Sequence, residues 1–261
     1  MPRTEYSMTR VAPTIAAALS MRSPAAASDG PVPEIAADLA GSARLAVLAP
    51  DALGLVSLEH FAPEMPFLHS LCETRMVTLR SVMPSITPVN FATMVSGTDL
   101  DGHGVRSKEM DFGCETLFDV LLEQGWTGAG CGRPGYSGSD LLARVAPING
   151  TAALGDDAAT EEVALRIARE LRPEFIITQI GGTDDHFHRF GPRGEGARPK
   201  VREMDQRLAR MAVELGGLGY ALIILADHGQ HETGDLAHMG SHGTDSDEDC
   251  LVPCTWVPAI D

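Results

Sequence analysis

The stretch YALIILADHG, residues 220–229, decides the fold class of this chain. Its first seven residues are apolar and include β-branched side chains, which is typical of a strand buried on both faces of a parallel sheet. The stretch then delivers Asp227 and His228, and a buried strand seldom ends in two ionisable residues for packing reasons alone. The pattern indicates an α/β sheet whose carboxyl edge carries functional groups.

Strands and helices alternate on both sides of this stretch. The expected strands cover residues 44–50, 76–79, 126–131, 175–180, 220–226 and 251–257. The expected helices cover residues 67–73, 115–124, 158–171 and 201–215. In the last helix the apolar residues recur at spacings of three and four, which marks an amphipathic helix. This alternation predicts a three-layer α/β sandwich with a mostly parallel central sheet.

Two domain regions are expected. Residues 1–42 are predicted to form an N-terminal helical extension and linker, because residues 22–34 (RSPAAASDGPVPE) have the composition of a connector. Residues 11–21 weakly resemble a secretory signal, but Pro13 and Arg22 favour an ordinary, peripheral helix. Residues 43–261 are predicted to form the main domain, in which residues 132–157 make at most a small cap.

Composition excludes several classes of partner. Against 20 Lys and Arg the chain has 36 Asp and Glu, a formal net charge of −16, which disfavours nucleic-acid polymers and anionic membranes. No apolar run reaches the roughly 18–20 residues that a membrane span needs. The five cysteines are scattered and form no Cys-x-x-Cys pair, so a reducing compartment and a cytoplasmic location are expected.

Candidate metal ligands follow three of the expected strands. They are Asp51 after residues 44–50, Asp184 and His188 after residues 175–180, Asp227 and His228 after residues 220–226, and His242 in a later glycine-rich stretch. Taken singly, such residues also occur as turn residues, helix caps or parts of solvated loops. Together they are expected to converge on one sheet edge. Carboxylate and imidazole ligands without thiolates suit zinc, manganese or iron, and this number suffices for two ions.

A candidate nucleophile lies in the stretch PSITPVN, residues 84–90. Thr87 precedes Pro88, and proline favours the first turn of a helix. Thr87 is therefore expected at the N-cap, where its hydroxyl would simply cap the helix. A helix N-terminus is also a place where anions bind, so a functional role stays open.

At this point the residues resemble a known family. The pieces are APDALG around Asp51, PSITPVN followed by SGTDLDGHGV, DDHFHRFGP at 184–192, ADHG at 226–229 and GSHG at 240–243. In this order they resemble the type I phosphodiesterase/nucleotide pyrophosphatase branch of the alkaline phosphatase superfamily. The resemblance spans about residues 44–257. It implies an alkaline-phosphatase-like catalytic domain with a minimal cap.

The resemblance also implies a ligand set for two divalent metal ions, most simply Zn²⁺, with Mn²⁺ or Fe as alternatives. One ion would be held by Asp184, His188 and His242. The other would be held by Asp51, Asp227 and His228, with Thr87 as the nucleophile bound to it. Asn90 would hydrogen-bond a non-bridging phosphoryl oxygen, whereas the family pattern requires nothing of Asp185 and His186.

Two departures from the family pattern stand out. The family's Asp-Gly is Asp51-Ala52 here, which a modest loop shift is expected to absorb. Pro88 has no N–H to offer a phosphate, so Asn90 is expected to carry more of the phosphoryl binding.

The implied activity is hydrolysis of a small phosphate ester through a phosphothreonine intermediate. A diester is expected to be preferred, because residues 81–100 contain no Lys or Arg to balance a dianionic monoester. The alternatives within the superfamily are a phosphomonoesterase, a phosphomutase or a phosphonoacetate-hydrolase-like enzyme. An alternative of another class is a non-catalytic protein that binds metal or phosphate.

Overall fold

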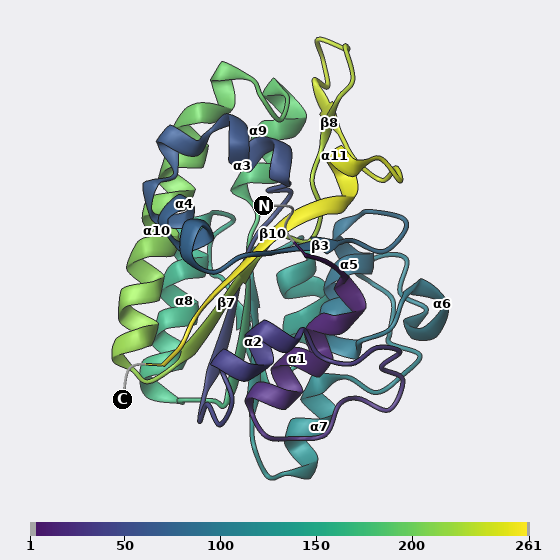
Figure 1. Cartoon of the computed structure of the whole chain (residues 1–261), viewed down its shortest axis with the longest axis vertical. Helices are drawn as coiled ribbons and strands as arrows, with labels where there is room; N and C mark the ends of the chain where they lie inside the picture. Colours follow the sequence, from purple (N-terminus) through teal and green to yellow (C-terminus); the bar gives the residue numbers. More distant parts are fainter. Residues whose placement is uncertain (1–3, 260–261) are drawn as a thin grey trace.

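The structure, a computed structural model, describes residues 4–259 and is built on an eight-stranded sheet (Figure 1). The strand order is β1-β3-β10-β7-β2-β6-β4-β5. The strands are β1 (Glu5–Ser7), β2 (Leu45–Pro50), β3 (Val77–Arg80), β4 (Gly128–Gly132), β5 (Ile148–Thr151), β6 (Phe175–Ile180), β7 (Ala221–Leu225) and β10 (Leu251–Val257). Among the described strands of this sheet, only β10 runs antiparallel to its neighbours, which confirms the prediction of a mostly parallel sheet.

Helices cover both faces of this sheet and make it the middle of three layers (Figure 1). On one face lie α4 (Pro66–Thr74), α8 (Asp157–Glu170), α9 (Gly182–Phe190) and α10 (Arg198–Gly217). On the other lie α1 (Val11–Ala18), α2 (Pro33–Asp38), α5 (Thr87–Ser96), α7 (Leu117–Glu123) and the π-helical segment η3 (Gly138–Ala143). The short elements are α3 (Leu55–His60), α6 (Leu100–His103), α11 (Asp247–Cys250) and the hairpin of β8 (His231–Glu232) and β9 (Gly240–Ser241).

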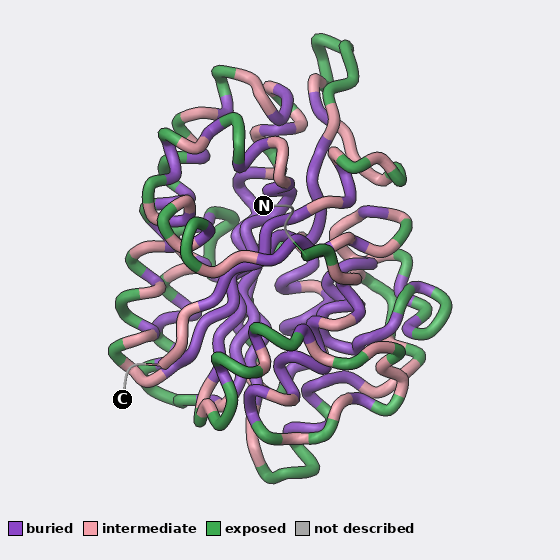
Figure 2. The backbone as a smooth tube through the Cα atoms, viewed as in Figure 1, coloured by how far each residue is buried: buried purple, intermediate pink, exposed green. Residues whose placement is uncertain are grey.

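The hydrophobic pattern explains this arrangement. Every residue of β2, β6 and β7 is buried, as expected for apolar strands covered on both faces, and Figure 2 shows these strands running through the buried centre. The stripe predicted for residues 201–215 is the buried side of α10, which begins three residues earlier, at Arg198. No helix within residues 4–259 combines the length and the apolar character needed to cross a bilayer.

The N-terminal segment is part of the core, so the prediction of a peripheral helix is wrong. Strand β1 pairs in parallel with β3, with Glu5 opposite Thr78, and α1 is buried along nearly its whole length. The cause is small side chains, which allow close helix packing against α5. A Cβ added at Gly97, the C-cap residue of α5, would lie 3.1 Å from Pro13 and 3.3 Å from Ala12. Residues 1–3 and 260–261, at the ends of the two expected regions, lie outside the described residues.

Residues 132–157, expected to form at most a small cap, extend the central sheet instead. They contain η3 and the edge strand β5, which pairs in parallel with β4. Glycines permit this packing, because a Cβ added at Gly132 would lie 2.6 Å from the Cα atom of Gly138.

Candidate active site

Three adjacent parallel strands deliver the candidate ligands to the carboxyl edge of the sheet. Strand β2 lies between β6 and β7. Asp51 directly follows β2, Asp227 comes two residues after β7, and Asp184 lies in the first turn of α9 after β6. This edge is where open α/β sheets bind ligands.

The inner group consists of Asp51, Asp227 and His228. Their potential ligand atoms lie within 4.8 Å of one another, and all three residues are buried. The Nε2 atom of His228 is 3.6 Å from Oδ1 of Asp51 and 3.4 Å from Oδ2 of Asp227. The structure therefore brings together the three residues that the family resemblance assigned to one metal site.

The outer group consists of Asp184, His188 and His242. The Oδ1 atom of Asp184 is 3.3 Å from Nε2 of His188 and 3.7 Å from Nε2 of His242. The His242 ring stacks on that of His228, with 4.0 Å between the ring centroids. Asp184, His228 and His242 also have potential ligand atoms within 4.8 Å of one another, so the inner and outer groups form one continuous cluster.

The three imidazoles are oriented as metal ligands are. In each, Nδ1 lies within hydrogen-bond distance of a backbone carbonyl: Gly229 for His228, Gly240 for His188 and Ser85 for His242. A carbonyl oxygen only accepts hydrogen bonds, so Nδ1 carries a proton in each ring, and in its neutral form each ring presents the Nε2 lone pair to the cluster. Such outer hydrogen bonds fix the tautomer of metal-binding histidines.

The two carboxylates of the inner group are incompletely paired within the described residues. Two oxygens, Oδ1 of Asp51 and Oδ2 of Asp227, are buried and have no hydrogen-bond partner. Burial and then the nearby Asp227 carboxylate raise the pKa of Asp51 well above its usual range. The hydrogen bond to Asp184 raises the pKa of His188 to about 9. The cluster thus favours added positive charge, and its donor set fits divalent metal ions.

Four side chains that the sequence reasoning missed hold these ligands. Gln179 donates through Nε2 to Oδ2 of Asp51, and Gln230 donates through Nε2 to Oδ1 of Asp184 at 2.6 Å. The hydroxyls of Thr183 and Ser81 donate to the backbone carbonyls of Asp51 and Asp227, each at 2.6 Å. Gln179 could have been recognised from the sequence, because it is a polar amide inside the otherwise largely apolar strand FIITQI.

Thr87 does not cap its helix, so the N-cap prediction is wrong. Helix α5 begins at Thr87 itself, and the N-cap position is Ile86, which has no side-chain cap. The Thr87 hydroxyl instead lies 3.0 Å from Nε2 of His228, at the inner group. The structure therefore leaves this hydroxyl available at the cluster.

The expectation that Asn90 contacts a phosphoryl oxygen does not match the structure. The side chain is fully buried, and its Oδ1 accepts a hydrogen bond from the backbone N–H of Val82 at 2.8 Å. Its Nδ2 donates to the carbonyls of Val82 and Ile86, each at 3.3 Å. Both ends of the amide thus brace the loop that leads into α5.

The Asp51-Ala52 departure places alanine in a backbone conformation that favours glycine. Ala52 adopts φ of 61°, in the left-handed region that favours glycine. Its N–H donates to Oδ1 of Asp227 at 3.1 Å, which ties the two strand ends together. Alanine therefore keeps the turn at a cost of about 1–2 kcal/mol.

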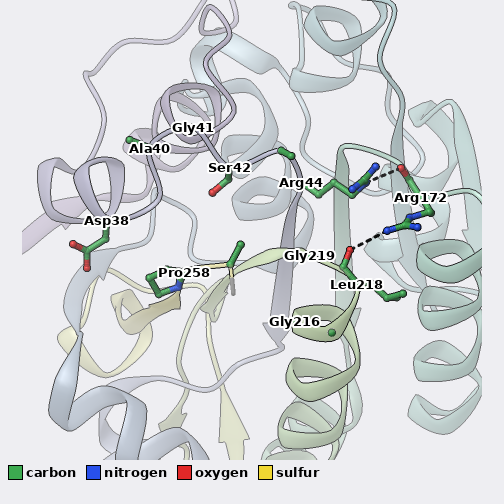
Figure 3. A pocket seen from close by; sticks show the side chains of 13 residues that line it. Asp38, Ala40, Gly41, Ser42, Arg44, Arg172, Gly216, Leu218, Gly219 and Pro258 are labelled. Carbon is green, nitrogen blue, oxygen red and sulfur yellow. Dashed lines mark hydrogen bonds between the residues drawn. The ribbon is translucent and has the colours of Figure 1, made fainter. Parts of the chain in front are cut away.

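A cavity of about 690 Å³ at the opposite, amino edge of the sheet has different chemistry. Figure 3 shows Arg44 and Arg172 in its wall, bonded to the backbone carbonyls of Arg172 and Leu218 respectively. The residues lining it include one carboxylate, Asp38, and no histidine. This cavity has no donor set for a metal centre, so the candidate active site is the carboxyl edge.

Comparisons with known proteins bear on the family of this chain. A family model described as type I phosphodiesterase / nucleotide pyrophosphatase matches residues 45–112 and 125–247. A comparison with curated proteins finds no match.

Solved structures of similar fold include phosphonoacetate hydrolase from Sinorhizobium meliloti 1021 in complex with phosphonoformate, with a TM-score of 0.57 and 20% identity over 72% of this chain and 57% of that one. Murine ectonucleotide pyrophosphatase / phosphodiesterase 5 gives a TM-score of 0.60 and 16% identity over 74% of this chain and 58% of that one. The chain thus spans less than two thirds of the length of either neighbour. Because the family model covers more than half of its residues, this chain belongs to the type I phosphodiesterase / nucleotide pyrophosphatase family, on an alkaline-phosphatase-like fold.

Proposed function

We propose that this chain is a metal-dependent phosphoric ester hydrolase of the phosphodiesterase type, with Thr87 as its nucleophile. One observation carries the proposal. The Thr87 hydroxyl lies 3.0 Å from Nε2 of His228, beside two buried carboxylates with unpaired oxygens. A hydroxyl that does not cap its own helix and faces a cluster of this kind is placed for attack on phosphorus.

The inner group with Thr87 would hold one divalent ion, and the outer group would hold the second. When bound, the two ions would supply Lewis-acid stabilisation of the phosphoryl charge and would lower the pKa of the nucleophilic hydroxyl. Zn²⁺ suits these ligands, and Mn²⁺ or Fe are the alternatives.

The chain's own residues would then carry the reaction in two steps. The Oγ1 atom of Thr87 loses its proton and forms a bond to phosphorus as the bond to the leaving oxygen breaks; the leaving oxygen takes up a proton, and a phosphothreonine remains. Water then attacks phosphorus, the bond to Thr87 breaks and the hydroxyl regains its proton. Asn90 would act by holding the loop before α5, and with it Thr87, in place.

A related protein supports a threonine nucleophile. A variant of the murine neighbour in which one threonine is replaced by alanine is described as inactive and in complex with AMP. That protein is only 15% identical to this chain, so a nucleotide ester is one member of the class of substrates to be tested.

Phosphonoacetate hydrolysis is a second candidate, because an enzyme with that activity is among the structural neighbours. It would use the same cluster to cleave a carbon–phosphorus bond.

The deciding experiment measures turnover by Zn²⁺- or Mn²⁺-loaded protein of a bis-aryl phosphate, a mono-aryl phosphate, phosphonoacetate and an aryl sulfate. Hydrolysis of a phosphate ester, together with a phosphoryl group trapped on Thr87 in acid-quenched protein, is the expected result. Turnover of phosphonoacetate alone would replace the first candidate by the second. Metal-loaded protein that turns over none of the four would overturn both.

A further inference from the structure

Helix α9, which carries two of the three outer ligands, has no side-chain cap of its own at its N-terminus. Asp184 and His188 lie one turn apart on α9, and the N-cap residue of this helix is Gly181, which makes no side-chain cap. Asp157, at the start of α8, takes over this role. Its two carboxylate oxygens lie 3.2 Å from the backbone N–H of Gly182, which donates to them.

A buried arginine completes the anchor. Arg133, directly after β4, donates through Nη1 to Oδ2 of Asp185 at 2.9 Å, and its Nε is 3.7 Å from Oδ1 of Asp157. Its guanidinium lies 3.7 Å from the centroid of the Tyr136 ring, and the Tyr136 hydroxyl donates to the other oxygen of Asp185 at 2.7 Å. Only 8% of the Arg133 side chain is exposed, whereas 41% of the Asp185 side chain is exposed, so the guanidinium is buried and its partner lies at the surface.

Two glycines leave room for this contact. A Cβ added at Gly181 would lie 2.5 Å from Nη2 of Arg133, and one added at Gly182 would lie 2.3 Å from Oδ2 of Asp157. The pair of glycines before Asp184 therefore lets a guanidinium and a carboxylate approach the backbone at the start of α9.

We propose that Arg133 is a positioning residue for the outer group. By holding Asp185 and Asp157 it fixes the first turn of α9, and so the placement of Asp184 and His188 opposite His242. It touches none of these three ligands. The inference rests on the proposed function in that the outer group holds a metal ion.

Arg207 provides a matched control. Its side chain is 5% exposed, and it pairs with two carboxylates, Glu161 on α8 and Glu203 on α10. Replacing either arginine by methionine removes one buried guanidinium that faces two carboxylates, one buried or nearly buried and one exposed. Only Arg133 is joined to the first turn of α9.

The test measures Zn²⁺ affinity by competition with a chromogenic chelator, in two backgrounds that each retain one group. Where Asp227→Asn has disabled the inner group, Arg133→Met should weaken Zn²⁺ binding about tenfold, the lower end of the effect known for outer-shell partners. In the background in which His242→Ala has disabled the outer group, Arg133→Met should change the Zn²⁺ affinity less than twofold. Arg207→Met should change the Zn²⁺ affinity by less than twofold in both backgrounds.

Milder variants keep the test decisive if Arg133→Met fails to fold. In the same background, Asp185→Asn should weaken Zn²⁺ binding by the outer group. Gly181→Ala should weaken it too, because the added Cβ displaces the guanidinium. Arg133→Lys should retain part of the affinity that Arg133→Met loses. The positioning role would be overturned if Arg133→Met and Arg207→Met lowered the Zn²⁺ affinity equally. It would also be overturned if Arg133→Met lowered the affinity by the same factor in both backgrounds. Wild-type protein that binds no Zn²⁺ would instead contradict the proposed function.

Discussion

The inner and outer groups contain the same kinds of ligand but are built differently. Asp51, Asp227 and His228 are at most 1% exposed and follow directly from two central strands. In the outer group, 37% of the His188 side chain is exposed, and its ligands come from α9 and the loop after β9. The inner group thus belongs to the core of the sheet, whereas the outer group depends on a helix that must be anchored from outside. Under the proposed function, this difference would suit a fixed nucleophile on the inner side and exchange with solvent on the outer side.

The first prediction removes the nucleophile and leaves both groups intact. Thr87→Ala should lower kcat by about a thousandfold or more while two metal ions stay bound, because it removes the chemical step and no imidazole or carboxylate. Thr87→Ser should retain part of the activity. Steady-state kinetics with elemental analysis of the same samples checks this, and near-wild-type turnover by Thr87→Ala would show that water attacks directly.

The second prediction separates the groups. His242→Ala should empty the outer site and leave the inner ion partly bound, whereas Asp227→Asn should do the reverse and also destabilise the fold more, because it disturbs a buried network. Each change should lower kcat about a hundredfold or more, as loss of a metal that stabilises transition-state charge would. Metal content, kcat and thermal unfolding of both variants give the answer. Identical metal loss in the two would mean that the groups form one indivisible site.

The third prediction concerns the charge around both groups. Arginines on the flanking elements have other partners: Arg80 pairs with Glu5 and Asp247, Arg133 pairs with Asp185, and the Arg189 guanidinium lies 4.9 Å from the centroid of the Phe190 ring. A singly charged diester should therefore be preferred over a dianionic monoester. The measurement is kcat/KM for a bis-aryl phosphate and its mono-aryl counterpart at one pH and with one metal. A tenfold advantage of the monoester, about 1.4 kcal/mol in the barrier, would reverse the assignment.

The smallest expected effect lies in the turn that joins the inner ligands. Ala52→Gly should raise the free energy of unfolding by about 1 kcal/mol, because glycine removes the left-handed strain at φ of 61°. Ala40, which is not among the positive-φ residues, is the control, and Ala40→Gly should lower stability slightly. Chemical denaturation of both variants tests this, and a destabilised Ala52→Gly would mean that the turn is not strained.

Much of this architecture could be predicted from the sequence, because its signals are local. Continuous apolar runs identified β2, β6 and β7, and a ligand after each run placed Asp51, Asp184 and Asp227 at one edge. The short strand β1 escaped prediction, since three residues with the sequence EYS carry no pattern. Helix α1 has no polar face from which its burial could be judged.

The outer contacts of the site could not be predicted for a different reason. The direction of the Asn90 amide depends on the loop at residues 82–86, and Arg133 finds Asp185 only because β4 lies beside β6. These contacts join segments far apart in the chain, and no periodicity in either segment encodes them.

The strand order also has a consequence for how the protein matures. Strand β2 lies early in the sequence, but both of its neighbours in the sheet, β6 and β7, come more than a hundred residues later. Bringing them together requires closing long loops, so the native ladder is a late event in folding. Before the central strands have paired, the only candidate ligands that lie close together are the pairs that are near in sequence, Asp184 with His188 and Asp227 with His228. Full coordination therefore has to wait for the central sheet, and metal added after refolding should be taken up as completely as metal present from the start.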